Sequence, residues 1–272
     1  MSTAPPGPEE QELTGGGVNQ VRRVGDTVRR PVRPWSGNVR RLLDHLRASG
    51  FDGAPRVLGT DAEGREIVEF IEGEVGHYPW TPQVAGRPAL LSAARLLRDY
   101  HLAAAGVASE LRTGWQFPTR DPVEVICHND FAPYNCVFRD GAAVGIIDFD
   151  TAGPGPRAWD LAYALYRFSP LSRPDAGGHY AAVDHFATAE AQAARARAFL
   201  DAYGCEADLR RAAVDLVVPR VRALATFLEQ AAAAGEEAFV QHVRAGHLDH
   251  YLRDIEYVEE RAPTWLALVV AD

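Results

Sequence analysis

The sequence contains no lysine, only three cysteines and one methionine, and no apolar run long enough to cross a membrane as a helix. All 28 basic side chains other than histidine are therefore arginines. Three irregularly spaced cysteines exclude a disulfide framework and do not match a zinc site. The start of the chain, Met1 to Leu13, is rich in Pro and Glu, unlike a signal peptide, so we expect a cytoplasmic protein with no membrane segment.

Positive charge is also scarce, since the formal net charge is −9. This balance argues against a nucleic-acid partner, because phosphate backbones require a basic surface. Residues 1–60 hold nine arginines against six acids (+3), whereas residues 61–272 hold nineteen against thirty-one (−12). The asymmetry is either ordinary solvated surface or the mark of an enzyme that holds a polyphosphate near its first part and a cationic acceptor against the second.

The first part of the chain has the pattern of short strands around one helix. Four strands are predicted, over residues 18–24, 27–30, 57–58 and 66–71. The first two flank Gly25-Asp26, which is typical of a hairpin, and the last two flank a turn over residues 61–64. A helix is expected after Asn38, which would be its N-cap, and before Gly50, with Val39, Leu42, Leu43 and Leu46 on its buried face.

The rest of the chain is mainly helical, apart from one hairpin. Helices are predicted over residues 89–105, 157–168, 183–203, 208–233 with a kink at Pro219, and 237–260. Strands over residues 136–138 and 144–148 flank Asp140-Gly141, a hairpin signal. The pattern predicts an α+β protein with a disordered tail (1–12), a small antiparallel β lobe with one helix (13–71) and a larger, mainly helical lobe (72–272).

The chemistry is concentrated in His128 to Asn135 and in Asp148-Phe149-Asp150. Phosphoryl transfer needs an oriented hydroxyl, a divalent metal on the phosphates and compensation of charge. Asp130 can accept a hydrogen bond from an acceptor hydroxyl, and the amide oxygen of Asn135 suits a hard cation. The intervening hairpin brings Asp148 back beside this loop, so one hairpin gathers a base and two metal ligands.

With this H-x-D-x-x-x-x-N spacing, the chain resembles the aminoglycoside phosphotransferase and choline kinase-like family, which has the protein-kinase-like two-lobe fold. The resemblance runs from about Leu13 to Tyr166 and includes Trp159-Asp160-Leu161-Ala162. Beyond Tyr166 only the helical character is shared.

The resemblance implies a role for each matching residue of the loop. Asp130 corresponds to the catalytic base and His128 to the residue that braces its loop, while Asn135 and Asp148 correspond to the ligands of Mg²⁺. Asp150 either assists the metal or caps the following turn. Asp160 is expected to be a strut for the catalytic loop or a helix cap.

The resemblance also places the nucleotide on the small lobe. The turn that covers the phosphates corresponds to Gly15, Gly16, Gly17 and Asn19, which are alternatively a flexible entry to the first strand. Arg29 stands where the family has a cation for the phosphates, but Val39 replaces its usual Glu partner, so that ion pair is missing unless Asp44 or Glu69 substitutes. The strand expected to meet the adenine or guanine edge through its backbone consists of Glu69, Phe70 and Ile71.

The implied function is an O-phosphotransferase that uses Mg²⁺ and ATP or GTP to phosphorylate a small, cationic acceptor such as an aminoglycoside or an amino alcohol. The candidate acceptor-binding residues are Trp159, Tyr163 and Tyr166, with acids such as Asp249, Asp254 and Glu256 on the last helix. For each of them, a packed aromatic ring or a solvated helix face is the commoner role.

Two alternatives stay open. One is a kinase that acts on Ser or Thr of a peptide in a natural-product pathway. The other is a non-catalytic, pseudokinase-like binding protein, which the missing ion pair favours and the presence of Asp130, Asn135 and Asp148 opposes. The sequence leaves the acceptor, the choice of nucleotide and the oligomeric state undetermined.

Overall fold

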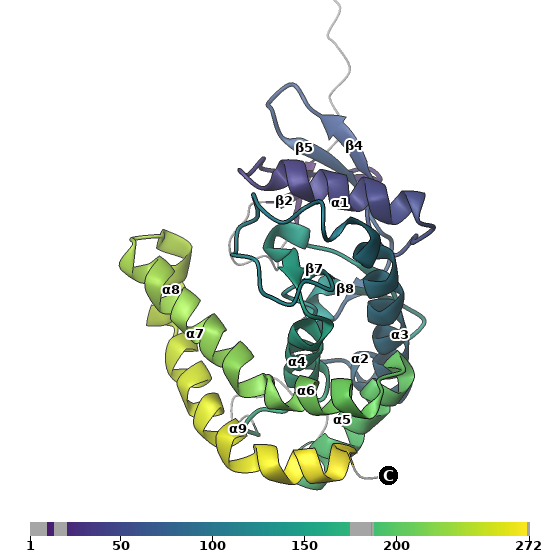
Figure 1. The fold of residues 1–272 in the computed structure, drawn as a ribbon. Helices are drawn as coiled ribbons and strands as arrows, with labels where there is room; N and C mark the ends of the chain where they lie inside the picture. Colours follow the sequence, from purple (N-terminus) through teal and green to yellow (C-terminus); the bar gives the residue numbers. More distant parts are fainter. Residues whose placement is uncertain (1–9, 14–20, 175–185, 187, 271–272) are drawn as a thin grey trace, which may run out of the picture.

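The protein consists of an antiparallel sheet with one helix, followed by a larger, mainly helical part (Figure 1). The computed structural model describes residues 10–13, 21–174, 186 and 188–270. Gly15, Gly16, Gly17 and Asn19 lie outside the described residues. The α+β, kinase-like architecture predicted from the sequence is confirmed.

The sheet has five strands in the order β1-β2-β3-β5-β4, all neighbours antiparallel. Its strands are β1 Glu10–Leu13, β2 Val21–Val24, β3 Thr27–Arg30, β4 Val57–Thr60 and β5 Glu66–Glu69. Val24 pairs with Thr27 across Gly25, whose φ of 59° suits the tight turn of the predicted hairpin. Residues 10–12, predicted to be part of a disordered tail, instead form β1 with Leu13, because they pair with β2.

Helix α1, Ser36–Ala48, buries the predicted face of Val39, Leu42, Leu43 and Leu46. It begins two residues before Asn38, so the predicted N-cap is wrong. The Asn38 side chain donates instead to the carbonyl of Thr113 at 2.7 Å, which ties the helix to a loop of the second part. Gly50, with a φ of 80°, follows the end of the helix as expected.

The second part begins with short elements that surround one long helix. They are β6 Glu74–Val75, α2 Pro82–Ala85, α3 Arg87–Ala104 and the 3₁₀ turn η1 Ala105–Val107. Helix α3 is the helix predicted over residues 89–105, and its buried face includes Leu90, Ala94, Leu97 and His101, which the helical spacing places together. The sequence pattern did not predict β6 or α2, which are four residues long or shorter.

The predicted hairpin around Asp140-Gly141 is confirmed by β8 Cys136–Arg139 and β9 Ala142–Ile146, which form a three-stranded sheet with β6. A second, two-stranded sheet joins β7 Val125–Cys127 to β10 Gly153–Gly155. Two 3₁₀ turns, η2 Pro133–Asn135 and η3 Phe149–Thr151, connect these strands. Segments far apart in sequence thus converge on residues 128–151.

The remaining helices are α4 Arg157–Phe168, α5 Ala189–Tyr203, α6 Ala207–Asp215, α7 Val217–Ala233, α8 Glu237–Arg244 and α9 His247–Val270. Helix α4 is the helix predicted over residues 157–168, and every residue in it after Arg157 is buried. In Figure 1, the C-terminal end of α7, α8 and the beginning of α9 form an arm at the left, apart from the rest of the helical part.

Two predicted helices are wrong, because each is broken in two. The helix expected over residues 208–233 breaks at Leu216, and Pro219 lies in the first turn of α7, where its missing N–H costs no hydrogen bond. The helix expected over residues 237–260 breaks before α9 at Gly246, whose φ is 83°, and α9 continues to Val270. No helix in the described ranges is long and apolar enough to span a membrane.

Candidate active site

The catalytic loop lies between β7 and β8, and the β8–β9 hairpin returns the chain to it. Cys136 pairs with Ile146, and the Ile147 N–H donates to the Asn135 carbonyl at 2.9 Å. Asp148 therefore follows directly after a residue that is bonded to the loop. Its own φ is 63°, a left-handed conformation that is uncommon outside glycine and turns the chain at this point.

Asp130 and Asn135 are in direct contact. The Nδ2 of Asn135 donates to the Asp130 backbone oxygen at 2.9 Å and to its Oδ2 at 2.8 Å. With Nδ2 used in this way, the remaining polar atom of the Asn135 amide is an oxygen, the atom type that a hard cation prefers.

A second donor reaches the other oxygen of Asp130. The Tyr134 hydroxyl donates to Oδ1 at 2.8 Å and lies 2.8 Å from the hydroxyl of Tyr163. Burial and the charge of Asp130 raise the pKa of Tyr134 well above its usual value, so the phenol stays protonated and remains a donor. The sequence prediction overlooked Tyr134, although its place one residue before Asn135 puts it on the same 3₁₀ turn.

Asp148 shares the site with two other carboxylates. Close packing of protein atoms around it, together with Asp150 and Asp130, raises its pKa to about 7, while Arg30 acts in the opposite direction. Asp148 nevertheless keeps exposed surface, so water and small solutes can reach it. Like charges held near each other favour binding of a cation.

The residues present fit a Mg²⁺ ion. No group of three or more His, Cys, Asp or Glu side chains with the arrangement of a metal site occurs among residues 10–13, 21–174, 186 and 188–270. Mg²⁺ does not need such a cage, because it is commonly held by one or two carboxylates together with waters and substrate phosphates. Asp148 and the amide oxygen of Asn135 match this sparse protein contribution.

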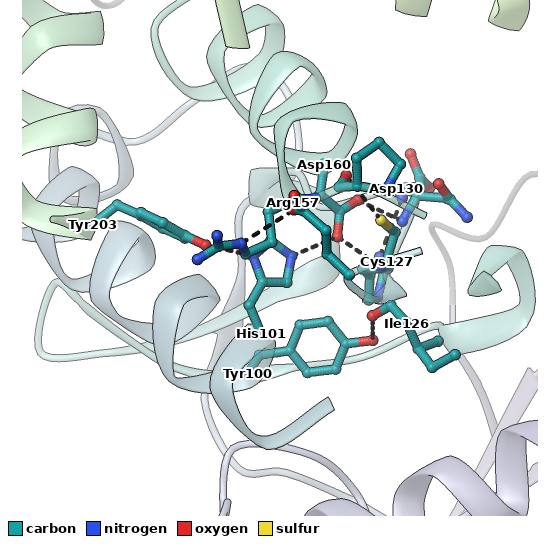
Figure 2. A network of polar contacts seen from close by, with 12 residues as sticks. Tyr100, His101, Ile126, Cys127, Asp130, Arg157, Asp160 and Tyr203 are labelled. Carbon is teal, nitrogen blue, oxygen red and sulfur yellow. Dashed lines mark hydrogen bonds and ion pairs between the residues drawn. The ribbon is translucent and has the colours of Figure 1, made fainter. Parts of the chain in front are cut away.

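A buried carboxylate holds the catalytic loop in place. Asp160, fully buried at the start of α4, accepts from the His128 N–H at 2.6 Å and from the Asn129 N–H at 2.7 Å. It also contacts His101 Nε2 at 3.0 Å, and His101 Nδ1 lies 2.8 Å from the hydroxyl of Tyr203 (Figure 2). Asp160 thus acts as the strut, one of the two roles that the sequence predicted, while the helical periodicity placed His101 on a buried face without indicating that it contacts Asp160.

The pKa of Asp160 reflects this setting. Burial alone raises it, but the hydrogen bond and the charge of His101, with the contact to His128, outweigh burial and lower it below its ordinary value. The folded protein therefore stabilises the ionised form of Asp160.

His128 joins the two halves of the site. Its Nε2 donates to the Ile147 carbonyl at 3.0 Å, while its Nδ1 accepts from the Asp130 N–H at 3.2 Å. Burial lowers the pKa of His128, which favours the neutral ring that this pattern of one donor and one acceptor requires. These are the loop-bracing hydrogen bonds predicted for His128.

The sheet presents Arg30, rather than the predicted Arg29, to the site. The Arg29 side chain turns to Asp61, at 3.6 Å, and to Thr27. Arg30 lies 2.7 Å from Glu66 and 3.5 Å from Asp150. Successive residues of a strand point to opposite faces, and Arg30 shares its face with Val28, so the position of that valine was the signal that could have identified it.

Glu66 replaces the carboxylate that α1 lacks. It is buried, it pairs with Arg30, and it lies 3.6 Å from Arg40 of α1. The ion pair described as missing is therefore supplied by strand β5, and neither Asp44 nor Glu69 substitutes. The Glu69 carboxylate instead binds Arg56 through two hydrogen bonds, of 2.9 and 2.8 Å.

The predicted base-binding strand connects the sheet to the helical part. The N–H groups of Glu69 and Phe70 donate to the carbonyls of Arg56 and Asp26, so both are engaged within the protein. Ile71 packs against Gly145 of β9, where a Cβ would lie 3.0 Å from its side chain.

The three predicted acceptor-binding aromatics all lie on α4 and are nearly inaccessible. Only Tyr163 reaches the neighbourhood of Asp130, through Tyr134. Tyr166 donates to Asp254 of α9 at 2.6 Å, so Asp254 is buried behind the site and does not line it. The guanidinium carbon of Arg120 lies over Trp159, 3.8 Å from the centre of the tryptophan ring.

Two arginines lie beside the catalytic loop. Arg167 donates to the hydroxyls of Tyr163 at 3.0 Å and Tyr251 at 3.1 Å. Arg220 of α7 donates to the carbonyl of Asn129, the residue before Asp130. The sequence prediction missed both, because each is brought to the loop by helix packing that no local pattern indicates.

Comparison with known proteins gives a consistent result. A model of a phosphotransferase enzyme family matches residues 113–214, which include the whole catalytic loop and α4. A trifolitoxin immunity protein from Rhizobium leguminosarum bv. trifolii is 36% identical over 213 residues, 76% of this chain and 78% of that protein.

Two solved structures share the fold. A choline/ethanolamine kinase family protein from Mesorhizobium loti has a TM-score of 0.62 and 16% identity, covering 97% of this chain and 93% of that one. A putative aminoglycoside phosphotransferase from Ralstonia eutropha has a TM-score of 0.60 and 15% identity, covering 94% of each chain.

Proposed function

We propose a reaction for this chain, which belongs to the phosphotransferase enzyme family: transfer of the γ-phosphoryl group of ATP or GTP to a hydroxyl of a small acceptor. Family and fold together make it a phosphotransferase that acts on a hydroxyl group. The nucleotide, the metal and the residue roles given below are our proposals.

Asp130 is the residue that orients the acceptor hydroxyl and takes its proton. One of its oxygens accepts from Asn135 and the other from Tyr134, so its carboxylate is held in a fixed direction. An oriented carboxylate supplies what phosphoryl transfer requires of a base, because this reaction depends on positioning more than on covalent chemistry. His128 and Asp160 keep the loop that carries it in place.

Asn135 and Asp148 would hold Mg²⁺, with Asp150 beside them. The metal would supply positive charge that neutralises the negative charge developing during transfer. Arg30 lies on the nucleotide side of this group, where a guanidinium can bind phosphate through two hydrogen bonds. It takes the role that the sequence assigned to Arg29.

The two lobes have separate tasks in this proposal. Residues 13–71 hold the nucleotide, with Gly15, Gly16, Gly17 and Asn19 over the phosphates and Glu69, Phe70 and Ile71 at the base. Residues 72–272 supply the catalytic loop and bind the acceptor. Within the second lobe, Gly76 ties the residue after β6 to the catalytic loop, since its N–H donates to the Pro133 carbonyl at 3.0 Å and a Cβ there would lie 2.7 Å from that oxygen.

Two hydrogen bonds carry the proposal. One joins the side chains of Asn135 and Asp130, and the other joins the Asn135 carbonyl to the N–H of Ile147, the residue before Asp148. Nucleotide binding and ADP or GDP release with an acceptor panel test it. We expect Asp130→Ala to lose at least about 100-fold in turnover, the lower range of a general base, and to keep its nucleotide affinity. Asp148→Ala should lose Mg²⁺-dependent nucleotide binding as well. Equal nucleotide affinity in wild type and Asp148→Ala contradicts the assignment.

The non-catalytic alternative loses its main support, because Arg30 and Glu66 supply the ion pair whose absence suggested it. The name of the Rhizobium relative favours a use of the reaction in protection against a toxin that bears a hydroxyl. The acceptor panel therefore includes aminoglycosides, amino alcohols and peptides with Ser or Thr. The arginines beside the catalytic loop do not favour the cationic members of that panel.

A further inference from the structure

Arg220 occupies an unusual place beside the catalytic loop. It lies on α7, is 7% exposed, and donates to the Asn129 carbonyl. Its guanidinium carbon lies 4.2 Å from the ring centre of Tyr163 and 5.4 Å from that of Trp159. A buried cation is thus fixed by one backbone oxygen and two aromatic faces, one residue from Asp130.

The partners of Arg220 do not include a carboxylate in the part of the chain that the structure describes. Its Nε is buried and makes no hydrogen bond there. A buried charge without an anionic partner is costly, and a buried donor without an acceptor adds to the cost. The arrangement therefore points to an acceptor atom that a ligand would provide.

A second guanidinium faces the same tryptophan. Arg120, on the loop between η1 and β7, is exposed and stacks on Trp159 at 3.8 Å. Partial burial and the charge of Arg220 lower the pKa of Arg120, which means that the two cations are close enough to repel each other. The repulsion between two guanidinium groups that share one aromatic neighbour would be relieved by an anion that contacts both.

The neighbouring acids are already committed to other arginines. Asp121 pairs with Arg112 at 3.0 Å, and Glu124 pairs with Arg157 at 3.2 Å. Arg120 has no carboxylate partner among the described residues, and its own backbone N–H is bound to Pro154. The two acids next to Arg120 in the sequence therefore do not neutralise this pair.

We propose that Arg120 and Arg220 bind a carboxylate of the acceptor, so that the substrate is a hydroxy acid rather than a polycation. This inference rests on the proposed function, because the acceptor hydroxyl must reach Asp130 while its carboxylate lies on the two arginines. Guanidinium groups suit carboxylates because their paired N–H donors match two oxygens. The nucleotide phosphates have a separate cation, Arg30, on the side of Asp150.

The test is a binding experiment without nucleotide, on a panel of hydroxy acids that includes N-acetylserine, N-acetyltyrosine and 4-hydroxyphenylacetate, each paired with its uncharged carboxamide. We expect at least one acid to bind at least ten-fold more tightly than its amide, measured by calorimetry. Arg120→Gln should remove about ten-fold of the affinity for that acid and leave the amide unchanged. The control is Arg112→Gln, which removes an exposed arginine of the same loop that does not stack on Trp159 and should change neither affinity.

Arg120→Gln is the decisive variant, because Arg220 also holds the catalytic loop and its removal could disturb that loop. Three outcomes overturn the carboxylate site: every acid binds with the same affinity as its amide, no acid binds at about 10 mM, or Arg112→Gln loses as much affinity as Arg120→Gln. Weakened MgATP binding in Arg120→Gln also overturns it, since the arginines would then serve the nucleotide. If the protein binds acids more tightly than their amides but releases no ADP or GDP with any acceptor, the proposed reaction is contradicted and the carboxylate site is supported.

Discussion

The sheet and the catalytic loop are held together by different kinds of polar contact. In the sheet, arginine–carboxylate pairs lie near the surface, such as Arg65 with Glu10 at 2.9 Å and Arg56 with Glu69 at 2.8 Å. At the catalytic loop, the fully buried Asp160 of α4 accepts hydrogen bonds from two backbone N–H groups of the loop and contacts a histidine. Water and salt weaken surface pairs, whereas a buried carboxylate depends on its partners. The loop geometry should therefore be fixed, and the polar contacts of the sheet should be replaceable.

The largest expected effect comes from the loop. Asp160→Ala should lower the free energy of unfolding by about 3–5 kcal/mol, the cost of breaking a buried charged contact, because two loop N–H groups and His101 lose their partner. Chemical denaturation followed by circular dichroism measures it. The control is Asp201→Ala, which removes an exposed carboxylate paired with Arg210 and should cost less than about 1 kcal/mol. Equal losses in the two variants contradict the comparison.

A comparison of wild type with Asp160→Ala also gives a test of the pH dependence of stability. The pKa of Asp160 is lowered from its ordinary 3.8, so the unfolded chain binds its proton more readily than the folded protein does. Its contribution is therefore complete above the unfolded pKa and is lost as the pH falls through the folded pKa. The stability difference between wild type and Asp160→Ala should be constant from about pH 5 to 7 and should shrink below about pH 4. A difference that grows on acidification would show that the sign is wrong.

A smaller effect is expected at Glu66, a buried carboxylate of the sheet whose partner Arg30 reaches Asp150. Glu66→Gln leaves Arg30 and Arg40 without this anion and should cost about 1–3 kcal/mol in stability, because a buried charged group loses its partner. It should also weaken nucleotide binding, since Arg30 is no longer held toward Asp150. Thermal denaturation and nucleotide titration measure the two effects.

The matched control is Glu69→Gln, on the same strand. Its partner Arg56 is exposed, and nothing in the contact reaches the catalytic loop. Both stability and nucleotide affinity should change little. If Glu69→Gln weakens the nucleotide as much as Glu66→Gln does, the effect comes from the base-binding strand and not from Arg30.

Local signals predicted the parts of the fold that local interactions determine. The β8–β9 hairpin followed from alternation around Asp140-Gly141, and α4 followed from its periodicity over residues 157–168. The same hairpin predicted that Asp148 returns to Asn135, which the bond between Ile147 and Asn135 confirms. These contacts are short in sequence, so turn and pattern rules capture them.

Contacts between segments that are distant in the sequence were not predicted. Asp160 was expected to hold the loop, but its partner His101 is 59 residues away and only tertiary packing joins them. Glu66 meets Arg30 across 36 residues, and Arg220 meets Asn129 across 91. The break at Leu216 was missed for a related reason, because α6 and α7 bury residues in one core and the apolar pattern continues across the interruption. The break at Gly246 has another cause, since α8 buries no residue and the positive φ of this glycine ends the helical stretch.

The smallest effect is expected for Arg65, which joins Asp61 and Glu10 near the surface of the sheet. Arg65→Gln should lower the Tm less than Glu66→Gln does, because solvent already screens these charges. The difference from wild type should disappear near 1 M NaCl, where the screening length is about 3 Å. Differential scanning calorimetry at low and high salt measures this difference in Tm. A Tm loss that persists at 1 M salt would mean that Arg65 stabilises the sheet through packing of the aliphatic part of its side chain. The sheet and the loop would then differ in how deeply their polar residues are buried, and not in how strongly salt weakens their charged contacts.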